Sequence, residues 1–107
     1  MIMIVVRWPV RPEHADAWPR ITQDFTAATR AEDGNLFFHW SRDVADPTVY
    51  WLVEGFREDA AEAHVSSDHF RTAQEQLPPY LVETPTVRNM QIPGDGWDEL
   101  GEFQVGS

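Results

Sequence analysis

Two of the four histidines lie within the seven-residue stretch HVSSDHF (His64–Phe70), beside a carboxylate and two hydroxyl groups. Imidazole can exchange a proton near neutral pH and is a common metal ligand. In one regular helix, residues five apart lie roughly 140° apart around the axis, so His64 and His69 would point in different directions. Paired metal ligands on a helix favour a spacing of four, and His14 and His39 fall on other elements. The spacing therefore predicts no metal site.

The helix is expected to break inside this stretch, because serine is poor in a helix interior and good as an N-cap. If Ser67 caps a second helical segment, Asp68 and His69 occupy its first turn. The helix dipole disfavours an imidazolium there, so His69 would stay neutral and able to act as a general base. The alternative is that Ser67 and Asp68 only cap the helix, and that both histidines fill half-buried positions with satisfied hydrogen bonds.

Glu54 is the only carboxylate in the apolar stretch TVYWLVEGF, residues 48–56. A carboxylate there is expected to be paired, to face solvent at a strand end, or to have a raised pKa. Aromatic side chains are more abundant than one sheet face needs, and some could line a pocket for a flat ligand; they are Trp8, Phe38, Trp40, Trp51 and Phe56. His39 alternates with Phe38 and Trp40 and is interpreted as a surface histidine.

Composition excludes several classes of function. The 107 residues suit one domain with a possible tail, and the net charge of −10 disfavours nucleic acid and anionic membrane surfaces. The chain has no cysteine and no lysine, so thiol and Schiff-base chemistry are excluded. The N-terminal apolar run is short and lacks a basic lead-in, which predicts neither a signal peptide nor a membrane span and favours a cytoplasmic location.

Hydrophobic periodicity predicts six elements in the order β-α-β-β-α-β. They are strands at 2–8, 35–40, 48–56 and 82–92, and helices at 13–31 and 58–77. This order is that of the ferredoxin-like α+β fold, a four-stranded antiparallel sheet with both helices on one face. Residues 1–92 form the predicted domain and residues 93–107 an acidic, glycine-containing tail that either frays or docks on a partner subunit. The apolar second face of the sheet predicts a homodimer.

Three segments, EDGNLFFHW (32–40), ADPTVYWLVEGFREDAAEAHVSSDHF (45–70) and PTVRNMQI (85–92), together resemble the quinol monooxygenase-like branch of the antibiotic biosynthesis monooxygenase (ABM) family. The resemblance implies a dimeric α/β barrel with a pocket between sheet and helices. It also implies oxidation of a quinol, phenol or anthrone-like polycyclic aromatic by O2, with no cofactor or metal. By position, Asn35, Glu54, His64 and His69 match the family pattern, and Phe70 would be a pocket wall.

Further site residues follow only from their location: Trp8, Phe38, Trp40 and Phe56 are expected to contact the substrate. Phe56 stands where the polyketide-modifying members of the family have a tryptophan. The particular substrates and mechanism of those members are therefore not expected for this chain. The haem-degrading relatives have tryptophan and a haem-ligating histidine where this chain has His64 and Gln74, so haem degradation is not expected.

Three functions remain open from the sequence. The first is a cofactor-independent monooxygenase that uses His64 or His69 as the base, with Glu54 as a further catalytic group. The second is an oxygen-independent enzyme on the same scaffold, such as an isomerase. The third is a non-catalytic domain that binds a small aromatic molecule.

Overall fold

A computed structural model of the chain describes residues 1–106 as an α+β fold. The strands are β1 (Ile2–Pro9), β2 (Asn35–Arg42), β3 (Val49–Phe56) and β4 (Thr86–Gln91), and the helices are α1 (Trp18–Ile21), α2 (Gln23–Arg30), α3 (Ala61–Val65) and α4 (Asp68–Gln76). Short 3-10 helices lie at Pro12–His14, Pro78–Tyr80 and Gly101–Phe103. The predicted order of strands and helical segments is confirmed.

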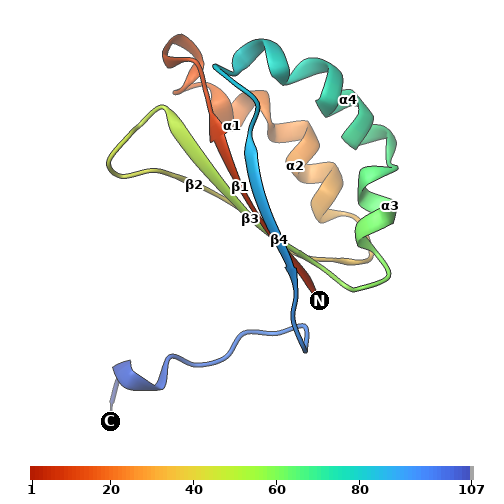
Figure 1. Ribbon diagram of the computed structural model, residues 1–107, viewed down its shortest axis with the longest axis vertical. Coiled ribbons are helices and arrows are strands. Elements are labelled where there is room, and N and C mark those ends of the chain that lie inside the picture. Colours follow the sequence, from red (N-terminus) through yellow and green to blue (C-terminus); the bar gives the residue numbers. More distant parts are fainter. Residues whose placement is uncertain (107) are drawn as a thin grey trace.

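The four strands form one antiparallel sheet in the order β2-β3-β1-β4. All four α-helices of residues 1–106 lie on one face of this sheet, and the C-terminal tail after β4 lies away from them (Figure 1). Because side chains alternate between the two faces of a strand, Tyr50, Leu52 and Glu54 share the helix-covered face of β3. The predicted fold class is therefore confirmed.

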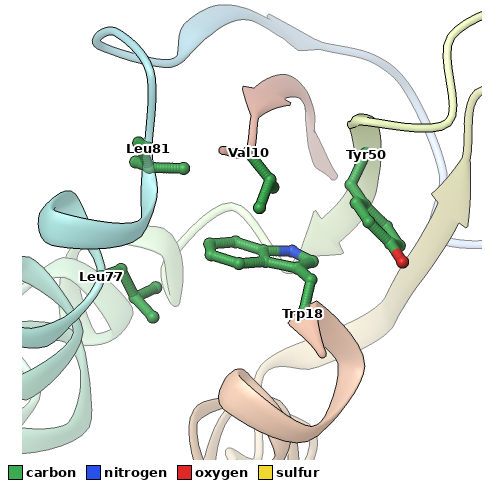
Figure 2. Packing of buried hydrophobic residues seen from close by; sticks show 5 residues of the cluster. All are labelled: Val10, Trp18, Tyr50, Leu77 and Leu81. Carbon is green, nitrogen blue, oxygen red and sulfur yellow. The ribbon is translucent and has the colours of Figure 1, made fainter. Parts of the chain in front are cut away.

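The buried core lies at one end of the sheet, where β1 leads into the helical layer. Trp18 has no exposed surface and packs among Val10, Tyr50, Leu77 and Leu81 (Figure 2). The Tyr50 hydroxyl donates a 2.9 Å hydrogen bond to the Ala15 carbonyl, so the polar end of this buried ring is satisfied. This cluster anchors the helices on the sheet and leaves the opposite end of the layer free for polar side chains.

Two predicted elements differ in the structure. The helix predicted at 13–31 is divided into a 3-10 turn, α1 and α2, with the break between α1 and α2 at Thr22. Proline fixes its own backbone angle and donates no hydrogen bond, so Pro12 and Pro19 each occupy the start of a short segment. The last strand begins at Thr86 rather than Val82, since Pro85 cannot donate to the sheet.

No helix in the described part of the chain covers the second face of the sheet, which carries apolar residues. Val5, Trp51 and Val53 are partly exposed there, and Met90 on the edge strand is exposed. The tail adds one contact to this face, since the ring of Trp97 lies 5.0 Å from that of Phe37. Within residues 1–106, the remaining apolar side chains of the tail, Leu100, Phe103 and Val105, are exposed.

Candidate functional site

The break in the second helical region positions both histidines. His64 lies near the end of α3, and Ser67 caps α4 by accepting a 3.2 Å hydrogen bond from the Phe70 amide. The Ser67 hydroxyl also donates to the His64 carbonyl at 2.6 Å. Asp68 and His69 therefore occupy the first turn of α4, and the break predicted at the serines is confirmed.

The two imidazoles point toward the same place, so the expectation that they point apart is wrong. Their ring centres are 5.9 Å apart, and both contact one carboxylate oxygen, Oε2 of Glu32. The 140° separation holds only for an unbroken helix, and the turn at Ser66–Ser67 rotates His69 back toward His64. The same helix break that the sequence predicts thus removes the argument against a shared site.

Glu32 is the central residue of the site and comes from the loop between α2 and β2. Its side chain is 16% exposed, and its Oε2 accepts a 2.8 Å hydrogen bond from Nδ1 of His64. A carboxylate can only accept, so this contact places a proton on Nδ1 of His64. In the neutral ring the other nitrogen, Nε2, then carries the lone pair and can accept a proton.

Glu54 faces that free nitrogen. Its Oε1 lies 3.7 Å from Nε2 of His64, which is beyond hydrogen-bond distance. Both side chains are almost fully buried. Burial raises the pKa of the Glu54 carboxyl to about 7, and the charge of Glu32 adds to the rise. The apolar setting thus keeps a large fraction of this carboxyl protonated at neutral pH.

Burial also decides the charge of His64. Removal from water lowers the pKa of this imidazole, although its hydrogen bond to Glu32 and the charge of that carboxylate act in the opposite direction. Phe56 and Phe70 enclose the ring, with centroid distances of 4.7 and 5.1 Å. His64 is therefore held neutral, with a fixed tautomer and a fixed orientation.

A cavity of about 620 Å³ opens beside this pair, between the sheet and α4. Its walls are mainly apolar, and Glu54, His64 and Asn89 are among the few polar residues that line it. Its aromatic walls are Trp8, Phe25 and Phe70. A cavity of this size and character suits a flat organic molecule with one or two polar groups.

The candidate residues fall into three groups. His64, Glu54, Trp8 and Phe70 line the cavity. His69 reaches the site through Glu32 but lies outside that lining. Phe38 and Phe56 are buried and pack against the His64 ring. Trp40 donates a hydrogen bond to Thr26 and lines a separate hollow of about 320 Å³. Asn35 donates to the backbone carbonyls of Phe37 and Gly55.

Two of the residues discussed from sequence lie on the uncovered sheet face. His39 is exposed, as predicted, and its ring stacks on that of Phe37. Trp51 donates a 2.9 Å hydrogen bond to Asp43 in the β2–β3 turn. Neither belongs to the cavity.

The sequence interpretation gave no role to Glu32 or to Phe25. Glu32 begins the segment EDGNLFFHW, but no spacing rule connects it to a histidine thirty-two positions later. Phe25 lies in the stretch predicted only as a helix at residues 13–31, and its ring lies 5.9 Å from that of His64 and 5.6 Å from that of Phe38. Only the fold shows that this residue also forms a cavity wall.

Comparisons with known proteins agree with this architecture. Residues 1–76 match the family model described as ABM, antibiotic biosynthesis monooxygenase. The "putative antibiotic biosynthesis monooxygenase" of Deinococcus radiodurans superposes with a TM-score of 0.81 at 22% identity, over 94% of this chain and all of that one. A protein of the same description from Nitrosomonas europaea gives a TM-score of 0.79 at 21% identity, over 88% of this chain and all of that one.

No curated protein matches the chain in sequence. None of the helices within residues 1–106 is long and apolar enough to cross a bilayer. The match of the family model covers most of the chain and includes β1 to β3 together with His64 and His69. A match to a family of this description supports a monooxygenase-like role. The chain therefore belongs to the antibiotic biosynthesis monooxygenase family.

Proposed function

We propose that this protein is a cofactor-independent monooxygenase of the quinol monooxygenase-like branch, which oxidises a quinol, phenol or anthrone-like aromatic with O2. The observation that carries the proposal is the arrangement of His64. Its Nδ1 is committed to Glu32, and the ring lines an apolar cavity beside Glu54. A neutral, oriented imidazole beside an apolar cavity is what deprotonation of a phenol requires.

In the proposed first step, Nε2 of His64 accepts the phenolic proton. The resulting phenolate is electron-rich, and the apolar walls do not stabilise its charge as water would. It can then transfer one electron to O2 and combine with the superoxide that forms, giving a peroxide on a ring carbon. His64 carries the proton, and Glu32 stabilises the imidazolium through Nδ1.

The second step breaks the O–O bond. The ring carbon loses its hydrogen and keeps one oxygen as a carbonyl, and the other oxygen leaves as water with that hydrogen and the phenolic proton. Each O2 thus yields one quinone-type carbonyl and one water. In this proposal the protonated form of Glu54, favoured by burial, donates its proton to the leaving oxygen, and the phenolic proton held by His64 then restores Glu54, so that no extra proton is consumed.

The proposal is tested by comparing turnover with and without O2 on a panel of hydroquinones, naphthols and anthrones. A chelator is included, and the His64→Gln variant is measured beside His39→Ala as an exposed control. General-base catalysis contributes roughly 10²- to 10⁴-fold, so His64→Gln should lose that much in kcat while His39→Ala keeps its rate. Equal turnover under nitrogen would refute the monooxygenase assignment.

A second candidate is an oxygen-independent isomerase, and the 3.7 Å approach of His64 and Glu54 favours it. A neutral base beside a protonated carboxyl can remove a proton from one atom of a substrate and return one to another. The isomerase candidate predicts turnover under nitrogen that requires both His64 and Glu54. The same panel, measured anaerobically, therefore separates the two enzymes, and ligand binding without any turnover would indicate a binding domain.

The chain is also proposed to act as a homodimer that pairs through the uncovered face of the sheet. That face carries Val5, Trp51 and Val53, and no helix of residues 1–106 covers it. Exposed apolar patches of this kind commonly mark subunit interfaces. Light scattering would test it: the dimer mass is expected, and Val53→Glu should yield the monomer. A native chain that is monomeric at micromolar concentration would contradict it.

A further inference from the structure

Three potential ligand atoms meet beside the break between α3 and α4. They are Nδ1 of His64, Nε2 of His69 and Oε2 of Glu32, and all lie within 4.8 Å of one another. The three residues come from α3, α4 and the loop before β2, so the fold, rather than one helix, brings them together. Two imidazole nitrogens and one carboxylate oxygen are a recurrent donor set for divalent transition metals.

The type of donor selects the type of ion. Magnesium and calcium prefer oxygen ligands, whereas zinc and its neighbours bind imidazole nitrogen at about 2.0–2.1 Å. Nδ1 of His64 already lies 2.8 Å from Oε2 of Glu32. When both nitrogens lose their protons, small rotations of these side chains would let one ion replace the two hydrogen bonds.

Glu54 provides a second observation that points to a metal. Metal-bound histidines commonly donate their other ring N–H to a carboxylate, and Oε1 of Glu54 lies 3.7 Å from Nε2 of His64. Within residues 1–106 the side chain of Glu54 makes no hydrogen bond, either to His64 or to another residue. A metal on Nδ1 would place a proton on Nε2, and this buried carboxylate would then gain a donor.

An ion can reach the cluster from solvent. The side chain of His69 is 24% exposed and that of Glu32 is 16% exposed, whereas His64 is enclosed. The net charge of −10 attracts cations to the whole surface. The exposed side would also leave room for water at a fourth position, as in zinc sites that do not have four protein ligands.

We propose that Glu32, His64 and His69 form a binding site for one divalent transition-metal ion of the zinc type; on the function proposed above, the bound ion inhibits proton transfer by His64. When the ion occupies Nδ1 of neutral His64, the proton moves to Nε2. That nitrogen then has no lone pair with which to deprotonate a substrate. The metal-bound form and the form active in proton transfer therefore exclude each other.

Calorimetric titration of the full-length protein with zinc chloride tests the site without reference to activity. One zinc per chain is expected, with no comparable heat from magnesium chloride. His69→Ala removes one ligand at a partly exposed position, and Glu32→Gln keeps the shape of the side chain without its charge. Each should weaken zinc binding at least tenfold, whereas His39→Ala, on the other face of the sheet, should bind as the native chain does.

Circular dichroism of each variant establishes that it is folded before the titration. Glu54→Gln should weaken zinc binding about tenfold, the lower end of the range for a partner of a metal-bound histidine. The proposal is overturned if the native protein gives no one-to-one binding, or if His69→Ala and Glu32→Gln bind zinc as tightly as His39→Ala. Because binding is measured directly, this result is independent of whether the protein turns over any substrate.

Discussion

Replacement of Glu54 by glutamine should change how stability depends on pH. The pKa of this carboxyl rises from 4.5 to about 7 in the folded chain because of burial, with a smaller contribution from Glu32. Between these values the folded state holds a proton that the unfolded state has released. Unfolding then releases a proton, so the free energy of unfolding falls as pH rises through this range.

The size of the effect follows from the shift. One pKa unit corresponds to about 1.4 kcal/mol, so the rise from 4.5 to about 7 costs the native chain about 3 kcal/mol above pH 7 relative to below pH 4.5. Glutamine keeps the shape and carries no charge. Glu54→Gln should therefore be more stable than the native chain at pH 8, by up to that amount, and should lose this advantage near pH 4.

Urea unfolding followed by tryptophan fluorescence, at fixed protein concentration from pH 4 to pH 8, measures this difference. The lowered pKa of His64 acts in the opposite direction, since the unfolded chain takes up the proton first and stability falls as pH drops. This contribution of His64 is present in both the native chain and Glu54→Gln, so subtracting one free energy of unfolding from the other removes most of it. Glu75→Gln, an exposed position on α4, serves as the control. A stability difference between Glu54→Gln and the native chain that is the same at pH 5 and pH 8 would refute the argument.

Two substitutions test how the backbone positions the site. Ser67→Ala removes the oxygen that accepts from the Phe70 amide and should cost about 1 kcal/mol; thermal unfolding measures this, and an unchanged midpoint would show that the cap does not hold α4. In Gly34→Ala the new methyl group would clash with the Cβ of Ala60, so the loop that carries Glu32 must shift. A loss of roughly 1–3 kcal/mol is expected, together with a lower rate, and a variant as stable as the native chain would contradict the close approach.

Local signals in the sequence were sufficient for the fold. The β-branched and aromatic runs predicted β1, β2 and β3, and the two serines predicted the helix break. They were insufficient where proline acted locally, as at Pro19, the second residue of the short helix α1, in a region where the periodicity predicted one long helix. Hydrophobic periodicity predicts which face of a helical region is apolar, but it does not show whether that region is one helix or several shorter ones.

The centre of the site depended on contacts that no local pattern contains. Glu32 meets His64 only because α2 ends and α3 begins at the same end of the sheet. The burial that raises the pKa of Glu54 likewise depends on side chains from several elements. Glu54 was correctly identified as unusual, since a carboxylate in an apolar strand must be compensated or neutral, but its partner could not be named from the sequence.

The most direct test of the central claim is the fate of labelled oxygen. The metal-free native protein is incubated with its best quinol or anthrone substrate under ¹⁸O2 in the presence of a chelator, and the product is analysed by mass spectrometry. The proposed chemistry predicts one labelled oxygen atom in each product molecule and the loss of this product in His64→Gln. A product whose new oxygen comes from water, or the same product formed under nitrogen, would contradict it.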